Sequence, residues 1–291
     1  MRSRLRGDSR HEEVNLASED VSKFNRRALL KWLAAGGAAS AIPVGLAGIT
    51  TESISVERHT LKLPQWDAHG MRVALLSDIH ANTQEDVDLA IEAMRLAMAQ
   101  KPDLIVLPGD FSNYGDDRRL GYIARSLEPL RDATCPVLAT LGNHDYSGLN
   151  VKGVMDTVRK SGVDLLVNEY RDFQGVTIFG FDDGASPTNS LDGFLSGNYS
   201  TSLVTLMHEP DIVYRMPKTI SLQLSGHSHG GQICLPGGYP LYTPHGAHDY
   251  YAGFYPHAPV PLFVTRGIGT VGPRLRLNCP PELSLLTLEK A

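Results

Sequence analysis

Short apolar runs alternate with amphipathic segments in the first half of the chain. The apolar runs have the length expected of buried strands, and they lie at Met71–Leu76, Leu104–Leu107 and Val137–Thr140. Between and after them, apolar residues recur every three or four positions, as on one face of a helix. Helices are therefore expected at Asp86–Gln100, Arg118–Leu130 and Val151–Lys160. Alternation of strand and helix favours a layered α/β fold with parallel strands.

The second half of the chain is richer in strand patterns. Strands are expected at Asp164–Asn168, Val176–Phe181, Ser202–Met207, Ser221–Leu224, Leu262–Thr265 and Ser284–Leu288. Ahead of the first buried run, Ser53–Leu63 alternates apolar and polar residues, which indicates an edge strand. Leu235–Pro261 is rich in Gly, Pro and Tyr without a clear period, so we expect a long loop there. Long loops in compact domains are usually functional.

The N-terminal region differs from the rest. Residues 1–24 are polar and charged, and Arg26-Arg27 then precedes the uncharged, Ala/Gly-rich run Trp32–Ile49. This arrangement resembles a twin-arginine export signal and implies the twin-arginine translocation machinery as a partner. The alternatives are a cytosolic amphipathic extension and a membrane anchor. The run has the minimum length of a membrane span, and Pro43 weakens it.

The resemblance to an export signal determines the domain boundaries and the cellular location that we expect. We expect a leader with signal at residues 1–50, a linker or edge strand at 51–70 and a catalytic domain at 71–291. Export places the catalytic domain in the periplasm or cell envelope, or anchored to a membrane and facing outward. Whether the signal is cleaved stays open, because Ala39-Ser40-Ala41 would leave a very short apolar region.

Composition narrows the classes of protein. The 291 residues are 42% hydrophobic and 20% charged, enough for one sizeable core. The net charge is −5, so the chain lacks the excess of positive charge that is typical of nucleic-acid-binding proteins. Nucleic acid is therefore not an expected partner. Cys135, Cys234 and Cys279 do not form a metal-binding cluster, and three cysteines cannot form a complete disulfide framework. A Cys234–Cys279 bridge after export stays possible.

Polar residues gather where the expected strands end. These fragments are Asp78-x-His80, Gly109-Asp110, Gly142-Asn143-His144-Asp145, His208-Glu209 and Gly226-His227-x-His229. In parallel α/β sheets the ligand crevice lies beyond the carboxyl ends of the strands. Alternate side chains of an extended backbone share a face, so Asp-x-His and His-x-His are each expected to aim at one site.

The chemistry of these groups favours metal ions. Histidine nitrogens and carboxylate oxygens suit Mn, Fe or Zn. Two ions about 3.5–4 Å apart can bind both oxygens of an in-line displacement and lower the pKa of water to about 7. Asp110, alone at its strand end, is the candidate bridge, and the surplus positive charge favours an anionic phosphate ester. Taken singly, Asp78 could cap a helix and His208 could be a core histidine, but together the five fragments favour metals.

The five fragments resemble the motifs of the calcineurin-like metallophosphoesterase superfamily over about residues 71–290. The resemblance implies a four-layer α/β/β/α sandwich. It implies one metal on Asp78, His80, Asp110 and His229, and a second on Asp110, Asn143, His208 and His227. His144 would contact the scissile phosphate, and Asp145 would orient it.

A bacterial branch of exported YkuE/YaeI-type phosphodiesterases is similar in finer detail. The leader, the run Gly226–Gln232 and the ending Cys279-Pro280-Pro281-Glu282 carry this resemblance, although that branch usually has Thr where this chain has Ser228. Some relatives cleave the pyrophosphate of UDP-2,3-diacylglucosamine. That reaction faces the cytoplasm, so the export signal argues against it here.

The expected activity is metal-dependent hydrolysis of phosphodiesters, with a lipid-like or cell-envelope substrate. The alternatives are a phosphomonoesterase, a UDP-2,3-diacylglucosamine-type pyrophosphatase and a non-catalytic binding module, although such modules usually lose metal ligands. Arg266, Arg274 and Arg276 are candidate phosphate contacts or solvated surface charges. Tyrosines of the long loop suit a boundary between water and lipid, and Trp32–Ile49 could hold the domain near a membrane.

Overall fold

The structure is a computed structural model that describes residues 53–68, 70–148, 150–184, 194–195 and 197–291. These residues all belong to one compact unit, Val44–Ala291. The expected leader, its Arg26-Arg27 pair and the Trp32–Ile49 run lie outside the described residues. Within the described part, no helix has both the length and the apolar character needed to cross a membrane.

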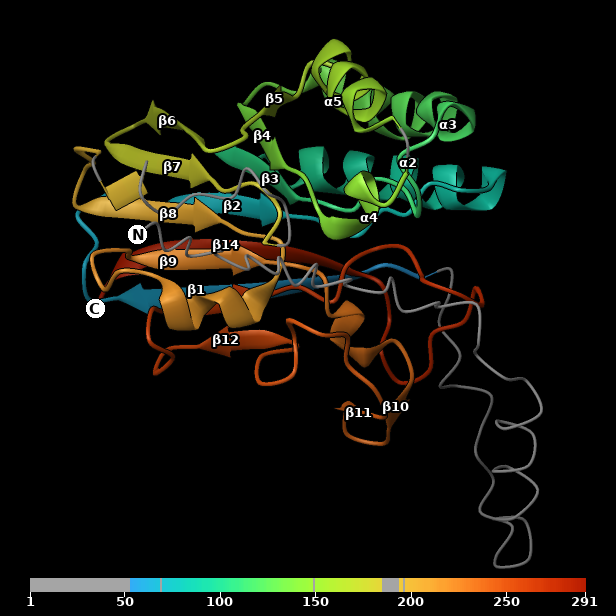
Figure 1. Cartoon of the computed structure of the whole chain (residues 1–291). Coiled ribbons are helices and arrows are strands. Elements are labelled where there is room, and N and C mark those ends of the chain that lie inside the picture. The colour runs from blue at the N-terminus through green and yellow to red at the C-terminus, as the bar shows by residue number, and fades with distance from the viewer. Residues whose placement is uncertain (1–52, 69, 149, 185–193, 196) are drawn as a thin grey trace, which may run out of the picture. The chain divides into compact units, whose positions relative to one another are not determined.

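Two sheets lie face to face in this unit (Figure 1). The first sheet has the order β1-β14-β2-β3-β4-β5. Its strands are β1 (Ser55–Leu63), β14 (Glu282–Lys290), β2 (Met71–Leu75), β3 (Leu104–Pro108), β4 (Val137–Thr140) and β5 (Asp164–Leu165). Strands β2 to β5 run parallel, whereas β14 runs antiparallel to β2. The expected edge strand before residue 70 is confirmed, because β1 pairs only with β14 in this sheet.

The second sheet has the order β12-β13-β9-β8-β7-β6. Its strands are β12 (Gly253–Tyr255), β13 (Leu262–Val264), β9 (Leu222–Ser225), β8 (Ser202–Leu206), β7 (Val176–Gly180) and β6 (Glu169–Phe173). The four central strands run parallel, and both edge strands are antiparallel to their neighbours. In Figure 1, β2, β7 and β8 point toward the side that carries α4 and the β10–β11 hairpin.

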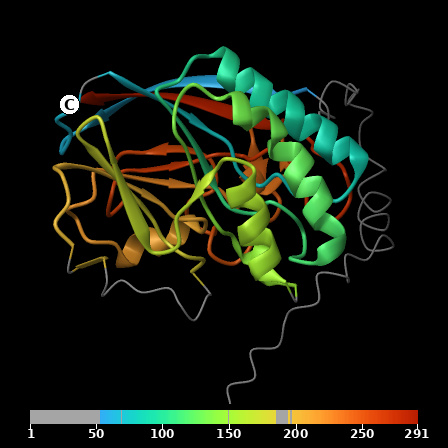
Figure 2. The ribbon, with the colours of Figure 1, turned by 90° about the horizontal axis from the view of Figure 1, so that it is seen from above.

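Helices cover the outer face of the first sheet. They are α2 (Gln84–Ala99), α3 (Asp117–Leu127, extended by the 3-10 helix η3, Glu128–Asp132) and α5 (Val151–Lys160). Figure 2 shows the three α-helices side by side. Helix α2 begins after Thr83, whose side chain accepts a hydrogen bond from Asp86 N while the Asp86 carboxylate accepts one from Thr83 N. This reciprocal cap explains the sharp start of the helix.

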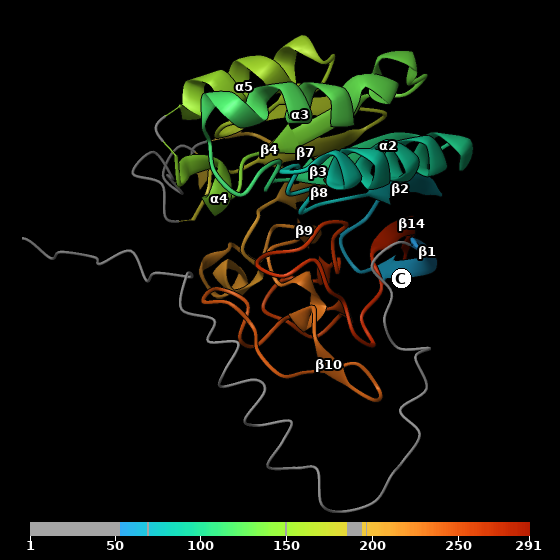
Figure 3. The same ribbon diagram turned by 90° about the vertical axis from the view of Figure 1, so that its right-hand side faces the viewer.

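Three apolar clusters separate four layers. One packs α2, α3 and α5 on the first sheet, one lies between the sheets, and one covers the outer face of the second sheet. Successive side chains of strand β8 point to opposite faces of the second sheet. Val204 and Leu206 face the first sheet, while Leu203 faces outward. The outer layer consists of the 3-10 helix η4 (Pro210–Arg215) and loops, and Figure 3 shows the same order of layers from the side. The expected layered α/β sandwich is confirmed.

The sequence pattern was wrong in three places in the second half. The strand expected at Asp164–Asn168 is limited to the two residues of β5. Strand β6 was missed because its side chains are mostly exposed and carry charges instead of an apolar pattern. The expected loop Leu235–Pro261 contains β10 (Cys234–Leu235), β11 (Tyr239–Pro240) and β12, which pair through tertiary contacts and have no sequence period.

Candidate metal centre

The expected site residues lie just beyond the carboxyl ends of parallel strands from both sheets. Backbone pairing continues past β2 and β3, with Asp78 N 3.1 Å from Gly109 O and His80 N 3.1 Å from Asp110 O. Gly226 N donates to His208 O at 3.1 Å, which joins the segments after β9 and β8 in the same way. His227 N then donates to the Asp78 carboxylate at 3.0 Å, across the two sheets. The fold therefore brings these separate fragments to one place.

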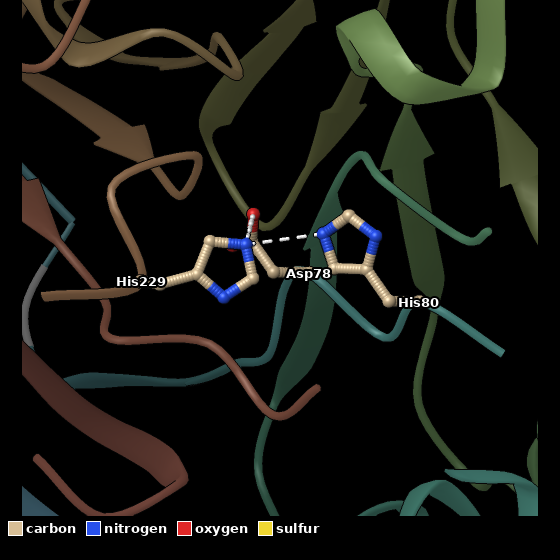
Figure 4. Close-up of side chains that lie close together, drawn as sticks. All are labelled: Asp78, His80 and His229. Atoms are coloured by element: carbon tan, nitrogen blue, oxygen red, sulfur yellow. Dashed lines mark hydrogen bonds and ion pairs between the residues drawn. The ribbon is translucent and has the colours of Figure 1, made fainter. Parts of the chain in front are cut away.

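Among the residues that the structure describes, two groups of three side chains are each close enough to hold a metal ion. The first consists of Asp78, His80 and His229, and the second of Asp110, His208 and His227. Figure 4 shows the first group, in which His229 Nε2 lies 3.1 Å from His80 Nε2 and 3.5 Å from Asp78 Oδ1. Two nitrogens bound to one ion at about 2.0–2.1 Å stand roughly 3.0–3.4 Å apart, so the spacing fits a shared ion.

Asp110 belongs to the second group and also contacts the first. Its Oδ2 is 3.4 Å from His80 Nε2 in the first group and 3.1 Å from His208 Nε2 in the second. Its other oxygen, Oδ1, accepts a hydrogen bond of 3.0 Å from His144 N. One carboxylate therefore contacts ring nitrogens of both groups, which is the position a bridging ligand occupies.

The two paired motifs behave differently. Asp78 and His80 join the same group, whereas His227 and His229 join different groups, as the family resemblance implied and as the rule for extended chains did not. That rule applies to neither pair, because the backbone is left-handed at all four residues, with φ of 55° at Asp78, 47° at His80, 70° at His227 and 51° at His229. Contacts of each ring with neighbouring loops, such as His227 Nε2 with His245 O, therefore decide which group the ring joins.

Backbone carbonyls fix which ring nitrogen of two histidines faces the site. His208 Nδ1 lies 2.6 Å from Pro108 O, and His227 Nε2 lies 2.8 Å from His245 O. A carbonyl only accepts hydrogen bonds, so these ring nitrogens carry the hydrogen. The opposite nitrogens, Nε2 of His208 and Nδ1 of His227, are left with a lone pair for a metal ion when the ring is neutral.

Burial and the charges within the site set its protonation, and they act in opposite directions. Burial lowers the pKa of His208, but Asp110 outweighs this effect and raises that pKa well above its ordinary value. Burial prevails at the next two residues. It lowers the pKa of His80 to about 3, although the charge of Asp110 opposes the shift. It also raises the pKa of Asp78 to about 6, with a further rise from Asp110 and an opposing effect of His208. For Asp110, burial is outweighed by His208 and His144, so its pKa falls well below the ordinary value. Neutral His80 and ionised Asp110 are the forms that bind metals.

The donor set fits divalent metal ions. Within the described residues, Asn143 Oδ1 is a buried atom without a hydrogen-bond partner, and His208 Nε2 contacts only Asp110 Oδ2, at 3.1 Å. An unpaired buried oxygen is costly, and both atoms belong to the expected second set of ligands. A metal ion would satisfy Asn143 Oδ1 and would lie between His208 and Asp110. Asn143 opens the short helix α4 (Asn143–Tyr146) that follows β4.

His144 and Asp145 have different surroundings from those expected. The ring of His144 is half-buried beside His80, and its Nδ1 lies 3.0 Å from Asn113 O. Instead of bonding to this ring, the Asp145 carboxylate accepts hydrogen bonds of 3.0 Å from the backbone amides of Asp110, Phe111 and Gly142. Burial, with the charge of Asp110, raises the pKa of Asp145 to about 7. Asp145 thus positions the loop that carries Asp110, and the Asn113 carbonyl positions His144.

The three arginines all bond to other parts of the fold. Arg266 pairs with Glu57 and Glu282, and Arg274 pairs with Asp86 at the start of α2. Arg276 is fully buried, and its guanidinium donates to the carbonyls of Arg266, Gly267, Gly269, His229 and Cys279. Arg276 is therefore neither a solvated charge nor an exposed phosphate contact. It supports the loop that carries His229.

Sequence reasoning missed a pair of buried acids beside the second group. The carboxyl groups of Asp183 and Glu209 are hydrogen-bonded to each other, and Glu209 also accepts a hydrogen bond of 3.0 Å from Gly184 N. Burial, followed by the contact with Glu209, raises the pKa of Asp183 to about 9. The sequence shows an acidic dipeptide after β7, which includes Asp183, and Glu209 directly after His208. Neither feature indicates that the carboxyl groups of Asp183 and Glu209 meet in the fold.

Comparison with known proteins agrees with the site. A family model described as calcineurin-like phosphoesterase matches residues 71–246. Over 291 aligned residues, the chain is 30% identical to the Bacillus subtilis protein "Uncharacterized metallophosphoesterase YkuE", covering 92% of this chain and 99% of the relative. It is 29% identical to "Phosphodiesterase YaeI" of Escherichia coli over 79% of this chain and 87% of that one. The chain belongs to the calcineurin-like phosphoesterase family and is a metallophosphoesterase with two candidate three-residue metal sites.

Proposed function

We propose that the protein hydrolyses phosphodiesters outside the cytoplasm with two divalent metal ions, Mn, Fe or Zn. The observation that carries the proposal is the position of Asp110 Oδ2, within 3.4 Å of a histidine nitrogen in each group. The first ion would be held by Asp78, His80, Asp110 and His229, and the second by Asp110, Asn143, His208 and His227. When bound, the ions would activate water and offset the negative charge of the phosphate.

His144 is the residue proposed to act on the leaving group. Because its Nδ1–H donates to the Asn113 carbonyl, Nε2 is the nitrogen left to face a substrate. The ring is half-buried beside the first group, whereas the rings of His80 and His208 are fully buried. His144 Nε2 can therefore hold a proton for the leaving oxygen or donate to a phosphate oxygen.

The β10–β11 hairpin and the residues after it support a substrate with an apolar part. Tyr239 is 65% exposed and Tyr242 is 73% exposed, and Leu235 and Leu241 are also exposed. Tyr242 O lies close to Gly231, two residues after His229, so this surface begins at the rim of the site. Residues 233–248 carry no Asp, Glu, Lys or Arg. The relative YaeI is named a phosphodiesterase, and an amphipathic wall suits an aryl or lipid-like diester.

A substrate panel tests the proposal. Metal-stripped protein would be re-supplied separately with Mn, Zn, Fe or Mg and assayed with aryl monoesters, aryl diesters and a pyrophosphate diester. We expect the highest kcat/KM with an aryl diester in Mn, Fe or Zn. A preference for small monoesters would contradict the proposed substrate class while leaving the metal centre intact, and activity in the metal-free protein would contradict both.

A double variant tests the hairpin surface. Leu241→Ser with Tyr242→Ser removes two exposed side chains without touching a core cluster, so metal content should not change. We expect kcat/KM for the aryl diester to fall by roughly 30-fold, since two lost apolar contacts at about 1 kcal/mol each amount to about 2 kcal/mol. Tyr170→Ser, on the edge strand β6, is the matched control at an exposed tyrosine elsewhere. An unchanged preference in the double variant would remove the hairpin from substrate binding.

Deletion of Tyr242–Tyr255 would be a poor test of the same idea. That segment supplies the His245 carbonyl that holds His227, and Tyr250 and Tyr255 pack on the outer apolar cluster. The aromatic residues of the loop thus divide into a packed set and an exposed set. Only the exposed set is available to a substrate.

A further inference from the structure

Cys234 and Cys279 lie together in the described structure, although 44 residues separate them in the sequence. Both are only 2% exposed, and each is a free thiol. Their sulfur atoms contact the same carbonyl oxygen, that of Gly230, at 3.1 Å for Cys234 and 3.5 Å for Cys279. The two thiols are also hydrogen-bonded to each other. Cys135 is in another place, in the segment before β4.

The thiol pair is in contact with the loop that carries a metal-site residue. Cys279 Sγ lies 3.2 Å from His229 O, and Arg276 joins the same carbonyl at 3.2 Å. A Cβ atom on Gly230 would stand 2.8 Å from Cys279 Sγ, so the loop packs directly on the sulfur. Hydrogen bonds hold the backbone of Cys234, with its N 2.9 Å from Leu277 O and the Asn278 side chain 3.0 Å from its O. Arg276 Nη1 donates to the backbone carbonyl of Cys279 at 3.3 Å.

We propose that Cys234 and Cys279 form a disulfide site that, when oxidised, steadies the loop carrying His229. The oxidant is a small-molecule or protein disulfide. A thiolate of Cys279 attacks one sulfur of that donor, the donor S–S bond breaks, and one donor thiolate leaves. Cys234 then attacks Cys279 Sγ in the mixed disulfide and releases the second donor thiolate. Two electrons pass to the donor, and the two cysteine protons end on its two thiols.

The structure indicates what the bond does. It would close a loop of roughly 45 residues that contains the β10–β11 hairpin, β12 and β13. It would also tie the start of β10 to the segment that presses on His229 and Gly230. Because Cys234 begins an exposed hairpin, local opening of that hairpin gives a donor access to the sulfurs. Oxidation is expected to slow the loss of metal from the first group and to raise the melting temperature.

Thiol counting after redox equilibration tests the proposal on the full chain. Reduced protein is incubated in glutathione buffers from fully reduced to fully oxidised, quenched with acid, denatured and alkylated. We expect three alkylated cysteines in the reduced form and one, Cys135, in the oxidised form, with a Cys234–Cys279 peptide in the digest. Cys135→Ser is the matched control, and it should change from two alkylated cysteines to none. Three alkylated cysteines at every ratio, or a bridge to Cys135, would overturn the proposal.

A second readout tests the effect on the metal site. Metal release to a chelator should be several-fold slower in the oxidised protein, and its melting temperature should rise by about 5–10 °C. Cys234→Ser and Cys279→Ser should show neither response to the glutathione ratio. Equal release rates in oxidised and reduced wild-type protein would overturn the coupling to His229. None of these measurements depends on the substrate, so their failure is distinguishable from failure of the proposed activity.

Discussion

Left-handed backbone conformations recur at Asp78, His80, Asp110, His227 and His229, with φ between 47° and 70°. A non-glycine residue in this region costs about 1–2 kcal/mol. Such strain persists only where the surroundings hold it, and here hydrogen bonds between neighbouring strand-end segments do so. The turns let one short segment after each strand aim its side chain back into the shared site.

Removal of the Asp110 carboxylate should disable both metal positions. Asp110→Ala takes away the oxygen that contacts both His80 and His208. We expect loss of both ions and of activity together, measured by elemental analysis and by hydrolysis of an aryl diester. Asp88→Ala, which removes an exposed carboxylate from α2, is the control and should keep both. Two full equivalents of metal in Asp110→Ala would refute the bridging role.

His144→Ala should separate catalysis from metal binding. His144 is not in either three-residue group, so both ions should stay bound. We expect kcat to fall by roughly 10² to 10⁴, the range for a lost acid–base group. The exposed His257→Ala on the loop before β13 serves as control. Normal kcat in His144→Ala would exclude this residue from the mechanism, and metal loss would make its role structural.

At the scale of elements, the strand-end loops interlock through glycines that leave no room for a side chain. A Cβ atom on Gly142 would lie 2.3 Å from Asp110 Oδ1 and 2.8 Å from His208 Cε1. A Cβ atom on Gly226 would lie 2.4 Å from Asp78 Oδ2. The loops after β2, β3, β4 and β9 therefore approach as closely as backbone allows, and this close approach sets the distances among the metal-site residues.

Gly142→Ala should damage the metal centre while the sandwich survives. The added methyl group must displace Asp110 or His208, and overpacking of this kind costs about 1–3 kcal/mol. We expect the affinity for Mn²⁺, measured by titration calorimetry, to fall roughly tenfold or more. Gly121→Ala is the matched control, because its methyl group meets nothing within 4 Å and replaces a glycine inside α3. That variant should gain about 0.5–1 kcal/mol of stability. Wild-type affinity in Gly142→Ala would contradict the interlocking of the loops.

For the whole molecule, export is the open prediction, and it depends on Arg26 and Arg27. Replacing both with lysine keeps the charge but removes the guanidinium groups that the translocation receptor is expected to recognise. We expect the double variant to stay in the cytoplasm in folded form, which fractionation and immunodetection would measure. A variant with lysine in place of Arg2 and Arg4 should be exported normally. Equal export of the Arg26/Arg27 variant would refute the twin-arginine hypothesis.

Much of this protein was determined by local sequence. Continuous apolar runs such as Leu104–Pro108 become buried strands because a central strand of a covered parallel sheet keeps both of its faces from water. Asp78, Asp110 and His208 could be selected as candidate ligands from the sequence because each lies within two residues of the end of such a run. The helices of the first half followed from their spacing, and their caps lie where the sequence has Thr83 and Asn150.

Long-range contacts decided the rest. The family resemblance implied the division of His227 and His229 between two groups, but the left-handed turns at these residues are stabilised only by the assembled loops. The burial of Arg276, the meeting of Asp183 with Glu209, and the contact between Cys234 and Cys279 each join segments distant in sequence. The edge strands β6 and β12 form because a neighbouring strand offers free backbone groups, a property of the sheet that no local pattern of side chains contains.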